Sequence, residues 1–264
     1  MLTTKVFSAP NRNPPVRLVG AGPGAPDLIT IRGARALENA EVVLYDDLAN
    51  AELLALCPAE CQRIYVGKRA GAHSASQEKI CELLVEKALT GQRVVRLKGG
   101  DPMVFGRAGE ELQALAEAGL DFEIVPGVTA AAAAGAMSGI PLTQRGITST
   151  MVFVTGHDCA DRATPVNWQA LAALRATLCI YMGTKRFGTI ADALIEGGLP
   201  VDTSVAVVAG ATLTSQHVRI GTLGDRDALT NDPARRPALI IVGEVVRWSE
   251  LATAANQLAV ASAS

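Results

Sequence analysis

Residues 94–107 read VVRLKGGDPMVFGR, a β-branched run that stops at a glycine pair and is followed by an Asp-Pro turn. The residue before a proline is held in extended backbone, so Asp101 and Pro102 separate the predicted strand from the helix that follows. Paired glycines let a ligand approach the backbone closely. Arg107 and Glu110 lie about one helical turn apart and share a face. This density of glycine, charge and proline at one strand end indicates a binding loop.

The same strand–loop–helix unit recurs along the chain. Short β-branched runs alternate with helical patterns, which predicts an α/β fold whose sheet is mainly parallel and covered by helices on both faces. The last strands lie closer together in sequence, so part of a second sheet is expected to be antiparallel. The expected strands are residues 16–19, 41–45, 63–66, 93–97, 122–125, 151–155, 177–181, 204–208, 217–220 and 238–242. The expected helices are residues 30–39, 49–55, 76–90, 106–118, 129–137, 168–174 and 187–196.

Glycine and proline near residues 139–143 punctuate the chain and predict a boundary between two domains. The expected parts are a flexible tail over residues 1–14, an N-terminal α/β domain over 15–140, a C-terminal α/β domain over 141–250 and a C-terminal tail over 251–264.

Composition narrows the classes of function. Of 264 residues, 49% are hydrophobic and 19% charged, which supports a well-buried core. A net charge of −2 and only 4% aromatic residues argue against a nucleic-acid partner. The N-terminus has no apolar core, and the alanine-rich stretch broken by Gly135 is too short to span a bilayer, so we expect a cytoplasmic protein without a membrane segment. The five cysteines and three histidines show no zinc-ligand spacing, which predicts reduced thiols and no metal.

The first glycine-rich loop, residues 20–25, matches the pattern G-x-G-x-x-A of dinucleotide-binding folds, and Asp46 follows at a suitable distance for a ribose ligand. Against this reading, Pro23 and Pro26 remove two N–H donors, and the next helix is expected only near Thr30. A helix that starts within the glycine loop would favour a nicotinamide- or flavin-dependent oxidoreductase. A tight turn without a ligand is the other alternative.

Two more strand ends carry charged side chains. Asp46 ends the second predicted strand, where a carboxylate could accept a proton, although its spacing alone favours a turn or helix-capping role. Lys68 and Arg69 follow the third strand and form a basic loop that suits an anionic ligand or is simply solvated.

Taken together, these segments resemble the uroporphyrinogen-III C-methyltransferase family of tetrapyrrole methylases. The resemblance covers nearly the whole chain, from about Val16 to Val246. The matching stretches are LVGAGPG (18–24), VVLYD (42–46), VGKR (66–69), HSASQ (73–77), VVRLKGGDP (94–102), FGR (105–107), VPGVTAA (125–131), GIPLT (139–143) with Arg145, FVTGH (153–157), YMG (181–183) and PALIIVGEVV (237–246).

The resemblance implies two α/β domains of the class III methyltransferase fold, usually in a homodimer, with the active site in a trough between the domains. It implies S-adenosyl-L-methionine as methyl donor, S-adenosyl-L-homocysteine as product and no metal. The implied reaction is methylation of uroporphyrinogen III at C2 and C7, giving precorrin-2 by way of precorrin-1, on a route to siroheme, heme d1 or cobalamin.

The resemblance also implies roles for individual residues. Asp46 corresponds to the proton acceptor and Lys68 to the proton donor. Arg107, Glu110 and Arg145 correspond to positions that hold substrate carboxylates and pyrrole N–H groups. The implied contacts of the methyl donor are Pro23, Gly99, Gly100, Asp101, Val104, Thr129, Ala130, Met182, Ala211 and Ala238.

Two further alternatives remain open from the sequence. One is a sibling methylase that acts on a later corrin intermediate or on a target that is not a tetrapyrrole. The other is a non-catalytic module that carries a tetrapyrrole; Asp46, Lys68 and the loop 99–101 argue against it.

Overall fold

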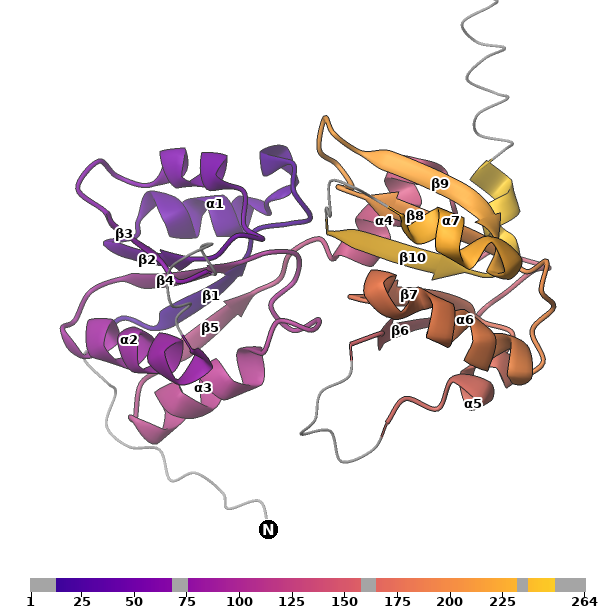
Figure 1. The fold of residues 1–264 in the computed structure, drawn as a ribbon. Coiled ribbons are helices and arrows are strands. Elements are labelled where there is room, and N and C mark those ends of the chain that lie inside the picture. The colour runs from indigo at the N-terminus through magenta and orange to yellow at the C-terminus, as the bar shows by residue number, and fades with distance from the viewer. Residues whose placement is uncertain (1–12, 68–75, 158–164, 232–236, 250–264) are drawn as a thin grey trace, which may run out of the picture. The chain divides into compact units, whose positions relative to one another are not determined.

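The computed structural model describes residues 13–67, 76–157, 165–231 and 237–249. The chain forms two compact units, Met1–Thr129 and Ala130–Ser264, each built on its own five-stranded sheet (Figure 1). The alternation of strands and helices expected from the sequence is present in both units, and the α/β fold class is confirmed. All ten expected strands are found within a residue or two of their predicted bounds.

The sheet of the first unit is entirely parallel, in the order β3-β2-β4-β1-β5. Its strands are β1 Val16–Gly20, β2 Val42–Tyr45, β3 Gln62–Tyr65, β4 Val94–Lys98 and β5 Phe122–Val125. Its helices are η1 Pro26–Leu28, α1 Ile31–Glu38, η2 Ala51–Leu56, α2 Gln77–Leu89 and α3 Ala108–Glu117. The α-helix expected at 49–55 is instead the short 3₁₀ helix η2, which Asn50 caps through Glu52 N and which ends just before Pro58.

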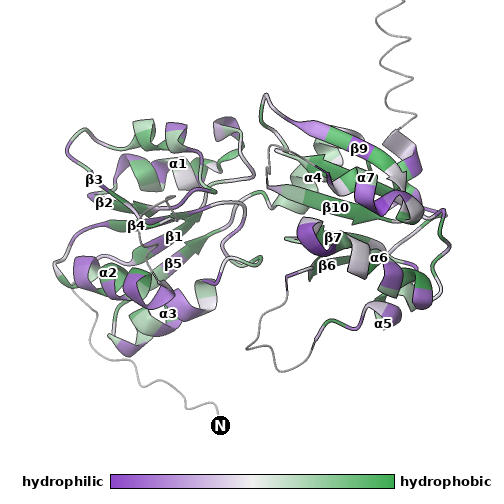
Figure 2. Ribbon diagram, in the orientation of Figure 1, coloured by the Kyte–Doolittle hydropathy of each residue, from purple (hydrophilic) through white to green (hydrophobic). Residues whose placement is uncertain are grey.

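Alternation along each strand sorts the core of the first unit into two layers. Val19, Val43 and Leu97 pack with α1 and η2 on one face of the sheet, whereas Leu18 and Leu44 pack with α2 and α3 on the other (Figure 1). Figure 2 shows hydrophobic residues concentrated along the strands and hydrophilic residues on the outer faces of the helices.

The second unit has a mixed sheet in the order β6-β7-β10-β8-β9. β6 and β7 are parallel, while β10 runs antiparallel to both β7 and β8, and β9 is antiparallel to β8. The predicted antiparallel part is therefore confirmed. The strands are β6 Met151–Thr155, β7 Thr177–Tyr181, β8 Ser204–Ala209, β9 His217–Thr222 and β10 Ala238–Val242. The helices are α4 Ala130–Ser138, α5 Trp168–Ala173, η3 Thr184–Arg186, α6 Phe187–Glu196, η4 Leu223–Asp225, α7 Arg226–Thr230 and η5 Glu244–Arg247.

Helix α4 belongs to the second unit, although the sequence placed it in the N-terminal domain. Ala131 and Ala134 are fully buried against Leu239 and Ile241 of β10. Small side chains let this helix lie close to the sheet, and that contact, invisible in the local sequence, draws it into the second core. The division between the units therefore falls at Thr129, earlier than the glycine and proline of residues 139–143 suggested.

Candidate active site

The loops of the first unit converge because its strands are parallel, so that all their carboxyl ends lie at one edge of the sheet. β1 and β2 lead into α1 and η2 on one face, whereas β4 leads into α3 on the other (Figure 1). The chain therefore reverses its winding direction between the adjacent strands β1 and β4. Open α/β sheets bind their ligands at such a switch point, outside the carboxyl ends of the strands.

At this switch point the β1 and β4 loops are joined backbone to backbone. Gly22 N donates to Gly100 O at 3.2 Å, and Gly100 N donates to Gly22 O at 2.6 Å. Both glycines have positive φ, 79° and 67°, which is the left-handed region that a side chain makes unfavourable. The two most glycine-rich motifs of the sequence thus form a single backbone surface.

The β5 loop joins this surface through Asp101. One carboxylate oxygen of Asp101 accepts from Gly127 N at 3.0 Å, and the other accepts from Met103 N at 2.8 Å. A Cβ on Gly127 would lie only 2.3 Å from Gly100 O, so these two loops approach as closely as glycine permits. Asp101 therefore fixes the shape of the loop, whatever else its half-buried carboxylate binds.

The β2 loop completes the edge. Asn50 Nδ2 donates to Gly24 O at 2.8 Å, which ties this loop to the β1 loop. Asp46 Oδ1 accepts from Leu48 N at 3.1 Å, so the carboxylate is held in a local turn. The adjacent Asp47 points elsewhere and accepts from the hydroxyl of Tyr65. Asp46 and Asp47 thus have separate environments, and Asp46 is the more buried of the two.

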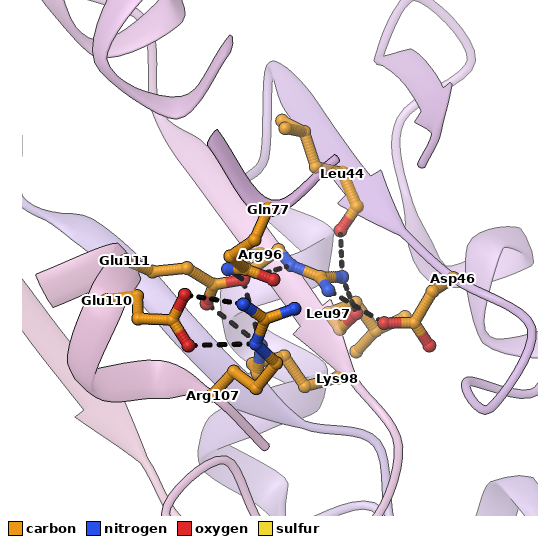
Figure 3. Close-up of polar contacts among 9 residues, drawn as sticks. All are labelled: Leu44, Asp46, Gln77, Arg96, Leu97, Lys98, Arg107, Glu110 and Glu111. Carbon is orange, nitrogen blue, oxygen red and sulfur yellow. Dashed lines mark hydrogen bonds and ion pairs between the residues drawn. The ribbon is translucent and has the colours of Figure 1, made fainter. Parts of the chain in front are cut away.

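Asp46 is the first of four charged side chains that contact one another in series, and the other three are buried (Figure 3). Arg96 Nη2 donates to Asp46 Oδ2 at 2.7 Å, and Arg96 Nε donates to Glu111 Oε1 at 3.1 Å. Lys98 Nζ then donates to both oxygens of Glu111 at 2.9 Å. The Glu111 side chain is 0% exposed, those of Arg96 and Lys98 are 4% and 5% exposed, and that of Asp46 is 24% exposed. Of these four side chains, only Asp46, at one end of the series, is substantially exposed to solvent.

The pKa of Lys98 is lowered, first by burial and then by the neighbouring Arg96, while Glu111 and Asp46 raise it. Two cations and two carboxylates share this small volume, so the cluster is balanced in formal charge.

Sequence reasoning missed Arg96, Lys98 and Glu111 as a functional group. A signal for them was present: residues 96 and 98 are alternate positions of a strand that otherwise reads as buried, so both charges face one layer and must find a partner there.

Arg107 and Glu110 lie at the start of α3, and they bind each other. Arg107 Nε and Nη2 donate to the two oxygens of Glu110 at 2.8 and 2.7 Å (Figure 3). Both side chains are about half exposed, so this pair contributes little to stability and can exchange for another carboxylate. Phe105 and Arg107 both have positive φ, near 50°, a strained conformation that is common at functional sites.

In the second unit, one sheet edge gathers four of the expected donor contacts. Ala238 begins β10, and because β10 is antiparallel to β7 and β8, it lies at the edge where those strands end. Met182 directly follows β7 with a strained φ of 54°, and Ala211 follows β8. Ala130 begins α4, whose next residue donates its N–H to the hydroxyl of Tyr181 at 3.1 Å.

The remaining expected contacts of the donor belong to the first unit. Gly99, Gly100, Asp101 and Val104 lie in the β4 loop, and Pro23 lies in the β1 loop. Thr129 ends the first unit, next to Ala130. The structure therefore sorts the ten residues into two sets, one at an edge of each sheet.

One expected substrate residue lies in the second unit, and one expected catalytic residue lies outside the described residues. Arg145 is exposed and lies in a turn closed by the bond from Gln144 N to Thr148 O at 2.9 Å in the second unit. Lys68 and its neighbours through residue 75 lie outside the described residues.

A hollow of about 400 Å³ lies in the second unit, lined by residues of β8, β9, β10, η3 and α7. Its polar lining includes Lys185, His217 and Arg219, but of the expected donor contacts only Ala238 borders it. The guanidinium of Arg219 is engaged with His217 and with Asn231 O. We therefore do not identify this hollow with the donor site.

The dinucleotide-binding alternative is wrong for this chain. No helix starts within residues 20–25; the short 3₁₀ helix η1 comes first, and α1 begins only at Ile31, with Thr30 Oγ1 accepting from Gly33 N at 3.1 Å. A Rossmann loop requires a helix N-terminus at its glycines to bind pyrophosphate.

Among the described residues, no group of three His, Cys, Asp or Glu side chains is arranged to hold a metal ion. Within the same ranges, the helices are too short or too polar to cross a bilayer.

Comparison with known proteins agrees with this geometry. Residues 15–227 match the tetrapyrrole (corrin/porphyrin) methylases. Siroheme synthase 1 of Yersinia enterocolitica is 53% identical over 237 residues, which cover 89% of this chain and 50% of the relative. The chain thus spans about half the length of the curated relatives it matches.

Solved structures show the same fold. The uroporphyrin-III C-methyltransferase of Thermus thermophilus, complexed with S-adenosylhomocysteine, is 39% identical with a TM-score of 0.75, over 89% of this chain and 99% of that one. A cobalt precorrin-4 methyltransferase is 31% identical with a TM-score of 0.77, over 88% and 95% of the two chains. The resemblance seen in the sequence motifs is confirmed, and the chain belongs to the tetrapyrrole (corrin/porphyrin) methylase family.

Proposed function

We propose that this chain is an S-adenosyl-L-methionine-dependent methyltransferase that methylates uroporphyrinogen III at C2 and C7, giving precorrin-2 by way of precorrin-1 and releasing S-adenosyl-L-homocysteine. The observation that carries the proposal is the fused backbone surface of the β1 and β4 loops at the switch point, with Asp46 held beside it in the β2 loop. The likeness to the Thermus uroporphyrin-III C-methyltransferase supports the same reaction.

The residues present fit the methyl donor. S-Adenosyl-L-methionine combines ribose hydroxyls and an amino-acid group with an adenine ring. The close-packed glycines of the β1, β4 and β5 loops leave peptide groups without side chains over them, and Asp101 adds a carboxylate for hydroxyl or ammonium donors. The exposed apolar side chain of Met182, at 54%, suits the faces of a ring.

In this proposal Pro23, Gly99, Gly100, Asp101 and Val104 of the first unit hold the donor. Thr129, which ends the first unit, serves with them, and so do Ala130, Met182, Ala211 and Ala238 of the second unit. When bound, the donor supplies a methyl group made electrophilic by the neighbouring sulfonium. The protein's task is then to orient the donor and the pyrrole carbon, since alignment alone lowers such barriers considerably.

The macrocycle carries carboxylates that require cationic partners. Arg107 and Arg145 are exposed and would bind them, each charge-assisted hydrogen bond contributing about 1.5–3 kcal/mol. Because Arg107 is paired with Glu110, a substrate carboxylate would replace that partner and release Glu110 to accept a pyrrole N–H.

Each methylation of a ring carbon must be followed by loss of a proton. Asp46 serves as the acceptor in our proposal, because its carboxylate is held by Leu48 N and Arg96 yet remains partly exposed. Lys68 is proposed as the proton donor on the family resemblance alone. We further propose that the chain forms a homodimer, which analytical ultracentrifugation would test, and that it is cytoplasmic, which cell fractionation would test.

The decisive experiment is incubation of the chain with S-adenosyl-L-methionine and anaerobically prepared uroporphyrinogen III, followed by mass analysis of the tetrapyrrole. A gain of two methyl groups is expected, with two molecules of S-adenosyl-L-homocysteine per macrocycle. A single methyl group would contradict the precorrin-2 product, and no gain with retained uroporphyrinogen would favour the tetrapyrrole carrier.

A later corrin intermediate is the second candidate substrate, because the cobalt precorrin-4 methyltransferase matches this fold as closely as the Thermus enzyme does. The higher sequence identity to the Thermus enzyme, 39% against 31%, favours uroporphyrinogen III. Side-by-side assays with both substrates distinguish them.

A further inference from the structure

The charged side chains connected to Asp46 alternate in sign from one contact to the next. Lys98 binds Glu111, Glu111 binds Arg96, and Arg96 binds Asp46, with contact distances between 2.7 and 3.1 Å (Figure 3). Lys98 and Arg96 lie on β4, Glu111 lies on α3, and Asp46 lies beyond the end of β2. Hydrogen bonds thus connect residues of a strand and a helix to a carboxylate that lies in a loop.

The geometry points to Arg96 as a positioning residue that aims the Asp46 carboxylate at the macrocycle, with Glu111 and Lys98 holding Arg96 in place. This inference rests on the proposed function, in which Asp46 accepts a proton. The inference goes beyond the proposed function by assigning a role to three residues that have no proposed contact with the substrate.

Arginine is required at this position because one guanidinium serves four acceptors. Nε donates to Glu111 and Nη2 to Asp46, while Nη1 donates to Leu97 O at 2.8 Å and Leu44 O at 3.5 Å. These donors lie in one plane and fix the direction of the bond to Asp46. A lysine offers a single ammonium on a flexible stem, so it cannot bind both carboxylates in this geometry.

Stability does not explain the cluster well. Replacing a buried ion pair by apolar side chains of similar size is often neutral or stabilising, so a buried pair is weak support for a stabilising role. The same layer of the first unit is elsewhere filled by aliphatic residues such as Leu18, Leu84 and Leu115. The charges replace that packing only at the carboxyl end of β4, where the loops converge.

The test is a double-mutant cycle on the full chain with Arg96→Lys, Asp46→Asn and the combined variant. Each is measured for kcat with uroporphyrinogen III, KM for both substrates and affinity for S-adenosyl-L-homocysteine. Arg93→Lys, which alters an exposed pair with Glu41 at 3.3 Å, and Asp47→Asn serve as matched controls.

We expect Arg96→Lys to lower kcat by roughly 10- to 100-fold, the effect of misplacing a reacting group by about 1 Å, with little change in donor KM or product affinity. In the Asp46→Asn background the same change should have almost no further effect, because Arg96 acts through Asp46. Both controls should keep wild-type kcat.

Other outcomes would overturn the inference. Independent, multiplicative losses would mean that Arg96 does not act through Asp46, and a parallel fall in product affinity would indicate a merely structural role. If Arg96→Lys does not fold, Asp46→Glu replaces it. This part-exposed change keeps the charge but moves the carboxylate, so full activity in that variant would refute positioning.

The failure of the proposed function has a different signature. Wild-type chain that transfers no methyl group to uroporphyrinogen III overturns both proposals at once. Active wild type with a fully active Asp46→Asn variant removes Asp46 as acceptor and the positioning role with it, while the methyl transfer itself stands.

Discussion

Glu111→Gln tests whether the buried charges depend on one another. Glu111 is fully buried and accepts from Arg96 Nε and Lys98 Nζ at 3.1 and 2.9 Å. Glutamine has nearly the same shape but keeps only one acceptor oxygen and turns an amide N–H₂ toward two cations. Breaking a buried pair by removing one partner costs about 3–5 kcal/mol. We expect the lower end, about 3 kcal/mol, because Lys98 can lose its proton.

Because Lys98 can lose its proton, the stability loss caused by Glu111→Gln should depend on pH. The pKa of Lys98 is already below its usual value of 10.5, and Glu111 opposes this shift, so the variant should lower the pKa further. A lysine with a lower pKa in the folded state binds fewer protons there than in the unfolded state, and folding is therefore favoured as pH rises through the folded pKa toward 10.5. The deficit of Glu111→Gln should accordingly shrink between neutral and alkaline pH.

Urea unfolding followed by far-ultraviolet circular dichroism measures the effect. A loss of about 3 kcal/mol moves the midpoint down by roughly 1–3 M for typical urea m-values. Hydrogen exchange of α3 locates the loss in the first unit, since both tryptophans, Trp168 and Trp248, report on the second. The neighbouring Glu110→Gln is the control, because its exposed pair with Arg107 is worth under about 1 kcal/mol. Equal losses for Glu110→Gln and Glu111→Gln, or a deficit that grows with pH, would refute the reasoning.

Gly127→Ala should destabilise the chain by roughly 1–3 kcal/mol and weaken binding of S-adenosyl-L-homocysteine, because its Cβ would lie 2.3 Å from Gly100 O. Gly109→Ala in α3 meets no atom within 4 Å and should instead stabilise by about 0.5–1 kcal/mol; thermal melts of both variants provide the comparison, and similar shifts would count against the close-packing argument. Burial raises the pKa of Cys179 to about 12, so peptide mapping should find it unmodified by iodoacetamide in the native chain at pH 8; rapid labelling would show that strand β7 is accessible. Arg107→Ala should raise the KM for uroporphyrinogen III by about tenfold or more while leaving product affinity unchanged in calorimetric titrations, and an equal loss of both would reject its assignment to the macrocycle.

The strands were predictable because β-branched runs flanked by glycine and proline report local geometry directly. The antiparallel placement of β10 was partly predictable from the short connections near the end of the chain. The position of α4 was not, because most of its residues are alanine, and such a helix shows no amphipathic face that would indicate its partner.

The residues of the candidate site likewise divide into those that the sequence could identify and those that it could not. Gly100 and Asp101 were identifiable because a strand end so rich in glycine and charge is unusual, whereas the role of Asp46 came only from the family resemblance. Glu111 was not, because it lies 15 residues from Arg96 and 13 from Lys98 and reads as one more glutamate of a surface helix. Only the packing of α3 on β4 reveals that it faces inward. The spacing of Arg107 and Glu110 indicated that they share a helical face, but it did not indicate their bidentate hydrogen bonding.

The backbone bridge between Gly22 and Gly100 restricts where this chain can be lengthened. The loops after β1, β2, β4 and β5 are joined to one another by hydrogen bonds at one rim of the sheet, so lengthening any of them would displace its neighbours as well. At the opposite rim, Gly119 lies exposed in the α3–β5 turn, where an added Cβ would meet nothing within 4 Å. Tags, fluorophores or inserted peptides should therefore be placed at the α3–β5 turn, where the chain can be extended without disturbing the surface proposed to hold the methyl donor.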